Sequence, residues 1–218
     1  MKNCNAPENQ TPRRILPIAC TTVLAVVFTV SLPQPAYADQ VRPPPVPADI
    51  EVPAGNKAFL QGHAVGTQNY ICLPSGSGFA WTLFTPQATL FKRGNKEITT
   101  HYFSPNPFEN GTLRATWQHS RDTSTVWGQV ITPSSDPNFV APGAIPWLLI
   151  KVVGAQDGPL GGHTLAGTTY IQRLGTLGGN APSTGCTQST DVGSKAFVPY
   201  TADYFFYRDR KGSADDGN

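Results

Sequence analysis

The chain has 218 residues, with 16 Lys and Arg against 14 Asp and Glu, and 39% of its residues are apolar. A nearly neutral chain without a basic run argues against nucleic acid or an anionic membrane as the main partner. The length suits one domain that is large enough to bury a core.

The first 38 residues have the pattern of a secretory signal peptide. Basic residues precede a mostly apolar run over residues 15–30, and Ala36-Tyr37-Ala38 is a small-x-small cleavage site. About 16 apolar residues are fewer than the roughly 20 that span a bilayer. We therefore expect cleavage near Ala38, no membrane span afterwards, and a protein that is secreted, extracellular or in the cell envelope. The remaining chain would carry 13 basic and 13 acidic residues.

The ends of the mature chain differ in composition from its middle. Residues 39–56 are rich in proline, so we expect an extended lead that cannot join the interior of a sheet. Residues 209–218 are charged and contain glycine, and we expect a disordered tail. A single β domain is expected over residues 57–208.

The expected elements of this domain are short strands separated by Gly, Pro, Asn, Asp and Ser, and no long window has a helical period. Residues 112–119 alternate apolar and polar side chains as a half-buried strand does. Residues 145–153 form an apolar run whose length, β-branched residues and early proline favour a core strand over a buried helix. In chain order the expected strands are 57–64, 67–73, 78–84, 88–92, 97–103, 112–119, 123–131, 145–153, 164–173 and 197–207.

This pattern predicts an all-β fold with long Gly/Pro-rich loops. Many short strands with frequent turns are typical of an antiparallel β-sandwich, which we expect, with a partly closed β-barrel as the alternative.

Two cysteines, Cys72 and Cys186, lie beyond the signal peptide. An even pair in an oxidising compartment favours a disulfide over two free thiols. A metal site is disfavoured because neither cysteine has a second Cys or His close by. The disulfide would anchor the glycine-rich loop that ends at Cys186.

No catalytic or cofactor motif stands out. The four histidines have no ligand spacing, so we expect no metal site. The loop 175–179 lacks the G-x-G-x-x-G spacing and opens no βαβ unit, so we expect no dinucleotide cofactor.

A candidate functional pocket rests on a few polar residues. His101 is the best candidate for a general acid or base. Asp203 could orient a histidine or bind a ligand hydroxyl; alternatively, it accepts hydrogen bonds from Arg173 or from the backbone. Tyr102 and Tyr204 are the neighbours of these residues and complete the candidate pocket.

Aromatic residues could line a groove for sugars or other flat ligands, or they could pack in the core of a β fold. We expect Trp81 and Trp147 in the core, and Trp117 and Trp127 as a candidate aromatic surface. Asn110 begins an N-G-T sequon, which is a glycosylation site if the host glycosylates exported proteins.

Several short sequence blocks, in a consistent order from about residue 66 to residue 207, carry a resemblance to a known family. They are G-T-Q-N-Y-I-C at 66–72, Trp81 with P-x-A-x-L at 86–90, I-P-W-L-L at 145–149, T-Y-I-Q-R at 169–173, G-G-x-A-P-x-x-G-C at 178–186 and V-P-Y-x-A-D-Y-x-F-Y at 198–207. Together these blocks resemble a secreted bacterial and fungal family, domain-of-unknown-function family 3455. The resemblance implies an extracellular, mostly-β domain and supplies no reaction.

The sequence thus favours a secreted, non-catalytic binding or structural module, with a glycan or another extracellular ligand as a possible partner. The alternative is a secreted hydrolase or lyase that uses His101 and Asp203, with Arg173 holding an anion. That alternative requires the three side chains to converge in one pocket.

Overall fold

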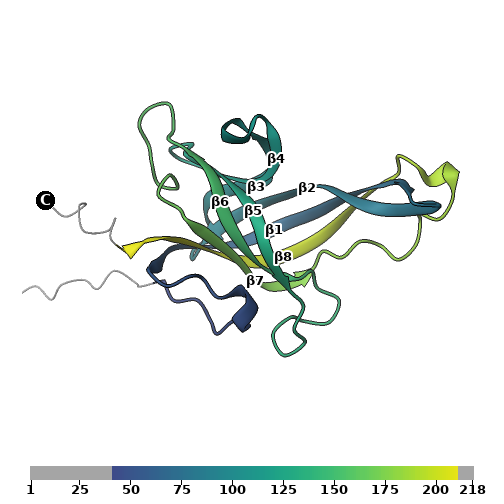
Figure 1. Cartoon of the computed structure of the whole chain (residues 1–218), viewed down its shortest axis with the longest axis horizontal. Coiled ribbons are helices and arrows are strands. Elements are labelled where there is room, and N and C mark those ends of the chain that lie inside the picture. The colour runs from purple at the N-terminus through teal and green to yellow at the C-terminus, as the bar shows by residue number, and fades with distance from the viewer. Residues whose placement is uncertain (1–40, 211–218) are drawn as a thin grey trace, which may run out of the picture. The chain divides into compact units, whose positions relative to one another are not determined.

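The computed structural model describes residues 41–210, which form an all-β fold. The expected signal peptide, and all but the first two residues of the expected tail, lie outside the described residues. Eight antiparallel strands form one closed barrel in the order β1 to β8, and β8 pairs with β1 (Figure 1). The strands are β1 (Asn56–Ser75), β2 (Gly78–Lys92), β3 (Lys96–Asn106), β4 (Thr112–His119), β5 (Thr125–Ser134), β6 (Trp147–Gln156), β7 (Tyr170–Gly178) and β8 (Lys195–Asp209).

The all-β, antiparallel prediction is confirmed, and of the two arrangements considered the barrel is the one that forms. The ten expected strands become eight because two neighbouring pairs are each one long strand. Gly66 does not interrupt β1, since it pairs with Ala88 on one side and with Tyr200 on the other. Pro86 lies inside β2 and pairs only with β1, so the N–H that it lacks is not needed on the β3 side.

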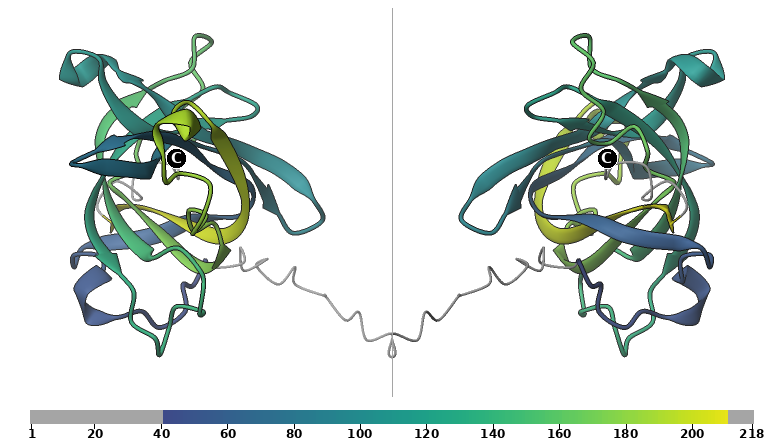
Figure 2. Two further views of the ribbon diagram at one scale, coloured as in Figure 1. Left: turned by 90° about the vertical axis from the view of Figure 1, so that its right-hand side faces the viewer. Right: turned by 90° about the vertical axis from the view of Figure 1, so that its left-hand side faces the viewer.

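The barrel interior is filled by an aromatic core. Trp117, Tyr204 and Phe206 are fully or almost fully buried there. The ring centroid of Trp117 lies 5.7 Å from that of Tyr204 and 6.4 Å from that of Phe206. Small residues on β1 make room for these rings; a Cβ at Gly62 would lie 2.8 Å from Ile98 Cδ1. Figure 2 shows the strands arranged as a ring, and the buried side chains named above fill its interior.

A second core lies on the outer face of β6, β7 and β8. Its buried members include Trp147, Leu174 and Phe205, and the proline-rich lead covers them through Ile50 in the 3₁₀ turn η1 (Ala48–Ile50). Gln172 Nε2 donates to the Ile50 carbonyl over 2.7 Å. The described part of the lead is therefore packed along the barrel wall.

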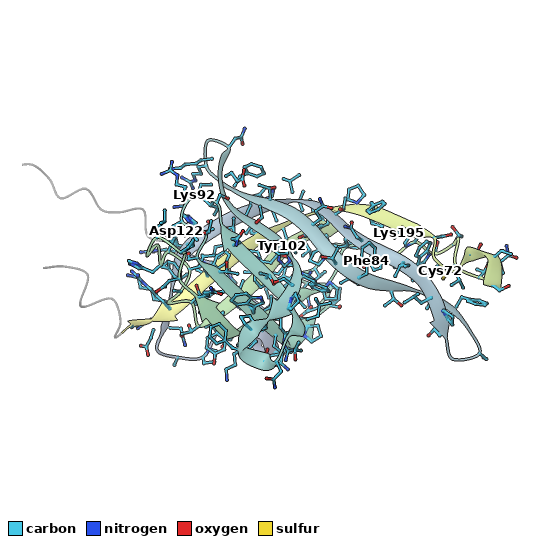
Figure 3. The ribbon with its side chains drawn as sticks, turned by 90° about the horizontal axis from the view of Figure 1, so that it is seen from above. Cys72, Phe84, Lys92, Tyr102, Asp122 and Lys195 are labelled. Carbon is cyan, nitrogen blue, oxygen red and sulfur yellow. A yellow bond between two sulfur atoms is a disulfide. The ribbon has the colours of Figure 1, made fainter. Side chains whose placement is uncertain are left out.

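β1, β2 and β8 continue past the barrel as an arm, on which Figure 3 labels Cys72 and Phe84. The predicted disulfide is confirmed: Cys72 is bonded to Cys186, with their Cα atoms 5.5 Å apart. Trp81 Nε1 donates to the Thr184 carbonyl over 2.9 Å. These contacts hold the glycine-rich loop against the arm.

Candidate functional site

A groove of about 920 Å³ lies on the outer wall of the barrel where β2 separates from β3. The ladder between these strands stops at the pair Ala88 and His101, two residues after Pro86 in β2. Beyond it the Thr85 hydroxyl accepts a hydrogen bond from the Phe103 N–H over 3.0 Å, in place of a backbone carbonyl. The lining residues are Val65, Gly66, Thr67, Thr85, Pro86, Gln87, Ala88, Thr89, Thr100, His101, Tyr102, Gln118 and Phe197.

Hydrogen-bonding side chains without charge dominate this groove. The register places Val65 opposite Thr89, Thr89 opposite Thr100 and Thr100 opposite Gln118, so one row crosses four strands on the same face. Phe197 adds an aromatic ring that is 59% exposed. The groove can therefore offer hydroxyl and amide groups together with aromatic faces.

His101 contributes to the groove's wall, but its ring points into the barrel interior. The imidazole stacks on Trp117 with centroids 4.3 Å apart, and Nδ1 lies 2.9 Å from the Thr116 carbonyl. Burial lowers the pKa of His101 to about 3, which outweighs the hydrogen bond to Thr116. The ring is thus neutral near pH 7, and its Nδ1–H donates to that carbonyl.

The other residues of the predicted pocket lie on two sides of the barrel wall. Tyr204 faces inward, 5.3 Å from His101 between ring centroids, and Arg173 is directly opposite Tyr204 on β7. Asp203 faces outward, as alternation along a strand requires, and its Oδ1 lies 3.0 Å from His63 Nδ1. Tyr102 also lines the outer groove. The structure does not bring His101, Arg173 and Asp203 together.

Arg173 is held by the backbone rather than by a carboxylate. Its Nε and Nη2 donate to the Pro146 carbonyl over 3.3 and 2.9 Å. Its charge contributes to lowering the pKa of His101, so the guanidinium lies near the barrel interior. The alternative in which Asp203 accepts from Arg173 is therefore not formed.

Comparison with known families gives one match. The model of a family described as "Protein of unknown function (DUF3455)" matches residues 53–208. The chain belongs to this family. The resemblance read from the sequence blocks is thereby confirmed. No curated protein and no solved structure matches the chain.

The two tryptophans expected on the surface of this DUF3455 domain are buried. Trp117 has no exposed area, because its strand phase turns it into the barrel. Trp127 does face outward, but Phe108 of η2 (Pro107–Glu109) covers it, and its Nε1 donates to Ser104 Oγ over 2.9 Å. Neither residue forms an exposed aromatic surface. Asn110 is exposed at the end of η2, as a glycosylation site must be.

A second groove of about 980 Å³ adjoins the first along β1 and β2 of the DUF3455 domain. Three of its lining side chains, Arg42, Lys92 and Arg93, are cations. On β1, His63 also lines this groove, two residues before Val65. Its lining residues are Val41, Arg42, Phe59, Leu60, Gln61, His63, Val65, Phe91, Lys92, Arg93, Gly94 and Asn95.

Sequence reasoning missed both grooves and the partner of Asp203. Thr67, Gln87 and Thr89 stand in the outward phase of their strands, and this alternation is visible in the sequence. Their assembly into one row depends on strand register, which the sequence does not show. His63 and Asp203 are 140 residues apart in the chain and meet only because β1 pairs with β8.

Within residues 41–210 no three His, Cys, Asp or Glu side chains are grouped so that they could hold a metal ion. In the same part of the chain no helix is long and apolar enough to cross a membrane.

Proposed function

We propose that this protein is an exported, non-catalytic binding module, and that the groove beside Tyr102 holds a hydroxyl-rich ligand, namely a glycan. The observation that carries the proposal is the lining of that groove, where threonine and glutamine side chains stand beside Tyr102 and the exposed ring of Phe197. Sugars present hydroxyl groups at their edges and C–H groups on their faces, and such a lining complements both.

The titratable side chains that line this groove are uncharged at neutral pH, which supports an uncharged binding face. The titratable side chains among its lining residues are His101 and Tyr102. His101 is neutral above about pH 3, and burial raises the pKa of Tyr102 above its ordinary value, so both are uncharged at neutral pH. Neither has a pKa near 7, where a general acid or base works best. This favours binding over catalysis.

The proposal is tested with the full chain, purified with its disulfide intact, on a glycan array and then by calorimetry with the glycan that binds best. We expect Gln87→Ala, which alters an exposed side chain of the groove, to weaken binding about tenfold through the loss of hydrogen bonds. The matched control is Gln129→Ala, an exposed glutamine on β5 outside the groove. Absence of binding to any glycan, or equal losses in both variants, would contradict the proposal.

A second candidate function, a secreted hydrolase or lyase, is supported by the His63–Asp203 pair. A carboxylate that orients an imidazole is a common arrangement for a general base, and His63 lines the second groove. The same glycan screen decides between the two functions when product release is also measured. Turnover that His63→Ala abolishes, and that the exposed-loop variant His163→Ala retains, would favour the enzyme.

A further inference from the structure

The outer side of β2 has no partner strand along the arm. The ladder between β2 and β3 covers only Ala88 to Lys92, and beyond it the Thr85 hydroxyl replaces a backbone partner for the Phe103 N–H. Within the part of the chain that the structure describes, residues 78–83 pair with β1 alone. Figure 1 shows β2 following β1 out along the arm, past β3. The unpaired side of residues 78–83 is called the free edge below.

The direction of the backbone groups on this edge follows from the neighbouring strand. The N–H and the carbonyl of Cys72 on β1 both bond residues 193–194, over 2.9 Å, so both point away from β2. Trp81 is opposite Cys72, and the two members of such an antiparallel pair both direct their backbone groups away from each other. Trp81, and by alternation Phe79 and Leu83, therefore offer donors and acceptors to a further strand.

The free edge lacks the residues that normally prevent strand addition. Exposed edges usually carry a charged side chain, often lysine, or a proline. Residues 78–83 read G-F-A-W-T-L and have neither, and no side chain of residues 78–91 is charged. The other edge of the arm differs, because residues 195–199 of β8, beyond the ladder to β7, include Lys195 and Pro199. One edge of the arm is thus protected and the other is not.

The free edge is already ordered and apolar before any partner arrives. Phe79, Trp81 and Leu83 project from one face, and Leu83 is 37% exposed. The disulfide of Cys72 and the hydrogen bond from Trp81 Nε1 to the Thr184 carbonyl fix this part of the arm. A strand that is held in place loses little conformational freedom when it pairs.

We propose that two copies of this protein pair through their free edges, antiparallel, about a twofold axis at Trp81. Facing residues of an antiparallel pair lie on the same side of the sheet, so a symmetric register must be centred on one residue. With Trp81 at the centre, Phe79 faces Leu83 of the second copy, and all three outward-directed residues form hydrogen-bonded pairs. Neither edge brings a charge that would repel the other. The inference goes beyond the proposed glycan binding and does not depend on it.

The test measures self-association of the full chain with its disulfide intact. Sedimentation velocity over a wide range of concentrations should show a monomer that converts into a dimer. We expect Leu83→Lys to weaken dimerisation about tenfold, because it places a charge beside Phe79 of the second copy. The matched control is Leu73→Lys on β1, the central strand of the arm, since Leu73 is 36% exposed and does not lie on the edge. It should change the dissociation constant by less than about twofold.

Hydrogen exchange on the unmodified chain identifies the surface that pairs. The amides of Phe79, Trp81 and Leu83 should exchange more slowly as the concentration rises, because each N–H gains a partner in the dimer. The amide of Leu160, in a fully exposed loop, should not respond to concentration.

Three outcomes would overturn the proposal. The first is a monomer at every concentration, and the second is a dimer that Leu83→Lys and Leu73→Lys weaken alike. The third is protection of the three edge amides only when a different protein is added, which would assign the free edge to a strand of that protein instead of a second copy.

Discussion

Asp122 is the residue on which the turn between β4 and β5 depends. Its carboxylate accepts hydrogen bonds from the N–H and hydroxyl of Thr164 and of Ser124, over 2.6 to 3.0 Å, and its Oδ1 lies 2.9 Å from His119 Nδ1. Gly162 allows this close approach, because a Cβ there would lie 2.2 Å from Asp122 Cβ. One carboxylate thus joins the turn to the loop that precedes β7.

These hydrogen bonds to the Asp122 carboxylate should make the free energy of unfolding depend on pH. Burial raises the pKa of Asp122, but the hydrogen bonds from Thr164 and Ser124 outweigh burial and hold the pKa well below its ordinary value. A carboxyl group with a depressed pKa stabilises the fold above its unfolded pKa, about 3.9, and this contribution is lost as the pH falls toward the folded value.

We expect Asp122→Asn to lower the free energy of unfolding at pH 7 by about 2 kcal/mol, since a charged acceptor of several hydrogen bonds is lost. The difference from the unmodified chain should shrink as the pH falls below about 4. Urea denaturation at pH 7 and at pH 3 measures both values. Asp157→Asn, in the exposed loop after β6, is the control and should change little; a loss that is equal at the two pH values would contradict this role of the Asp122 carboxylate.

Among elements, the long strands β1 and β2 determine the shape of the candidate site. They approach closely at Gly66, where a Cβ would lie 2.1 Å from the Gln87 carbonyl oxygen and 2.5 Å from Ala88 Cα. Both atoms belong to the backbone and cannot rotate away. Gly66 therefore holds β1 against the strand that carries one wall of the groove.

Gly66→Ala should lower the free energy of unfolding by about 1–3 kcal/mol, because the backbones must separate to admit the methyl group. It should also weaken the proposed binding of a glycan, since Thr67 and Gln87 move apart. The matched change is Gly167→Ala, where nothing lies within 4 Å of the added Cβ. Urea denaturation with both variants tests this expectation, which fails if they are equally stable.

Local strand positions could be read from the sequence more readily than their assembly. Residues 112–119 were expected as a strand and are β4 with the same bounds, since alternation is a local property. Gly66 and Pro86 favoured breaks in β1 and β2, and both are accommodated by pairing that only the complete sheet provides. His101 was the expected acid or base, and its inward phase makes it a neutral core residue.

For the whole molecule, the disulfide joins residues separated by 114 positions and fastens the arm. In the chain-entropy model, closing a loop of about 100 residues is worth up to about 4.7 kcal/mol. The pairing was predictable because only two cysteines lie beyond residue 38, where the sequence predicts that the signal peptide ends. Barrel closure was less so, because it depends on β1 meeting β8 at the far end of the sequence.

Reduction should lower the thermal midpoint of the unmodified chain, and the double variant Cys72→Ser, Cys186→Ser should unfold at that lower temperature with or without reductant. The physical reason is the larger number of conformations open to the unlinked unfolded chain. Thermal unfolding followed by circular dichroism measures it. Equal midpoints for the oxidised and reduced chains would contradict this role of the bridge.

The pairing of the first strand with the last has a consequence for how the molecule forms. From Asn56 opposite Asp209 to Ile71 opposite Lys195, nearly all of β1 pairs with β8. Of the eight strands, β8 is the one that is synthesised last. Contacts at such sequence distance are slow to form. A growing chain therefore cannot close this barrel before β8 has been synthesised.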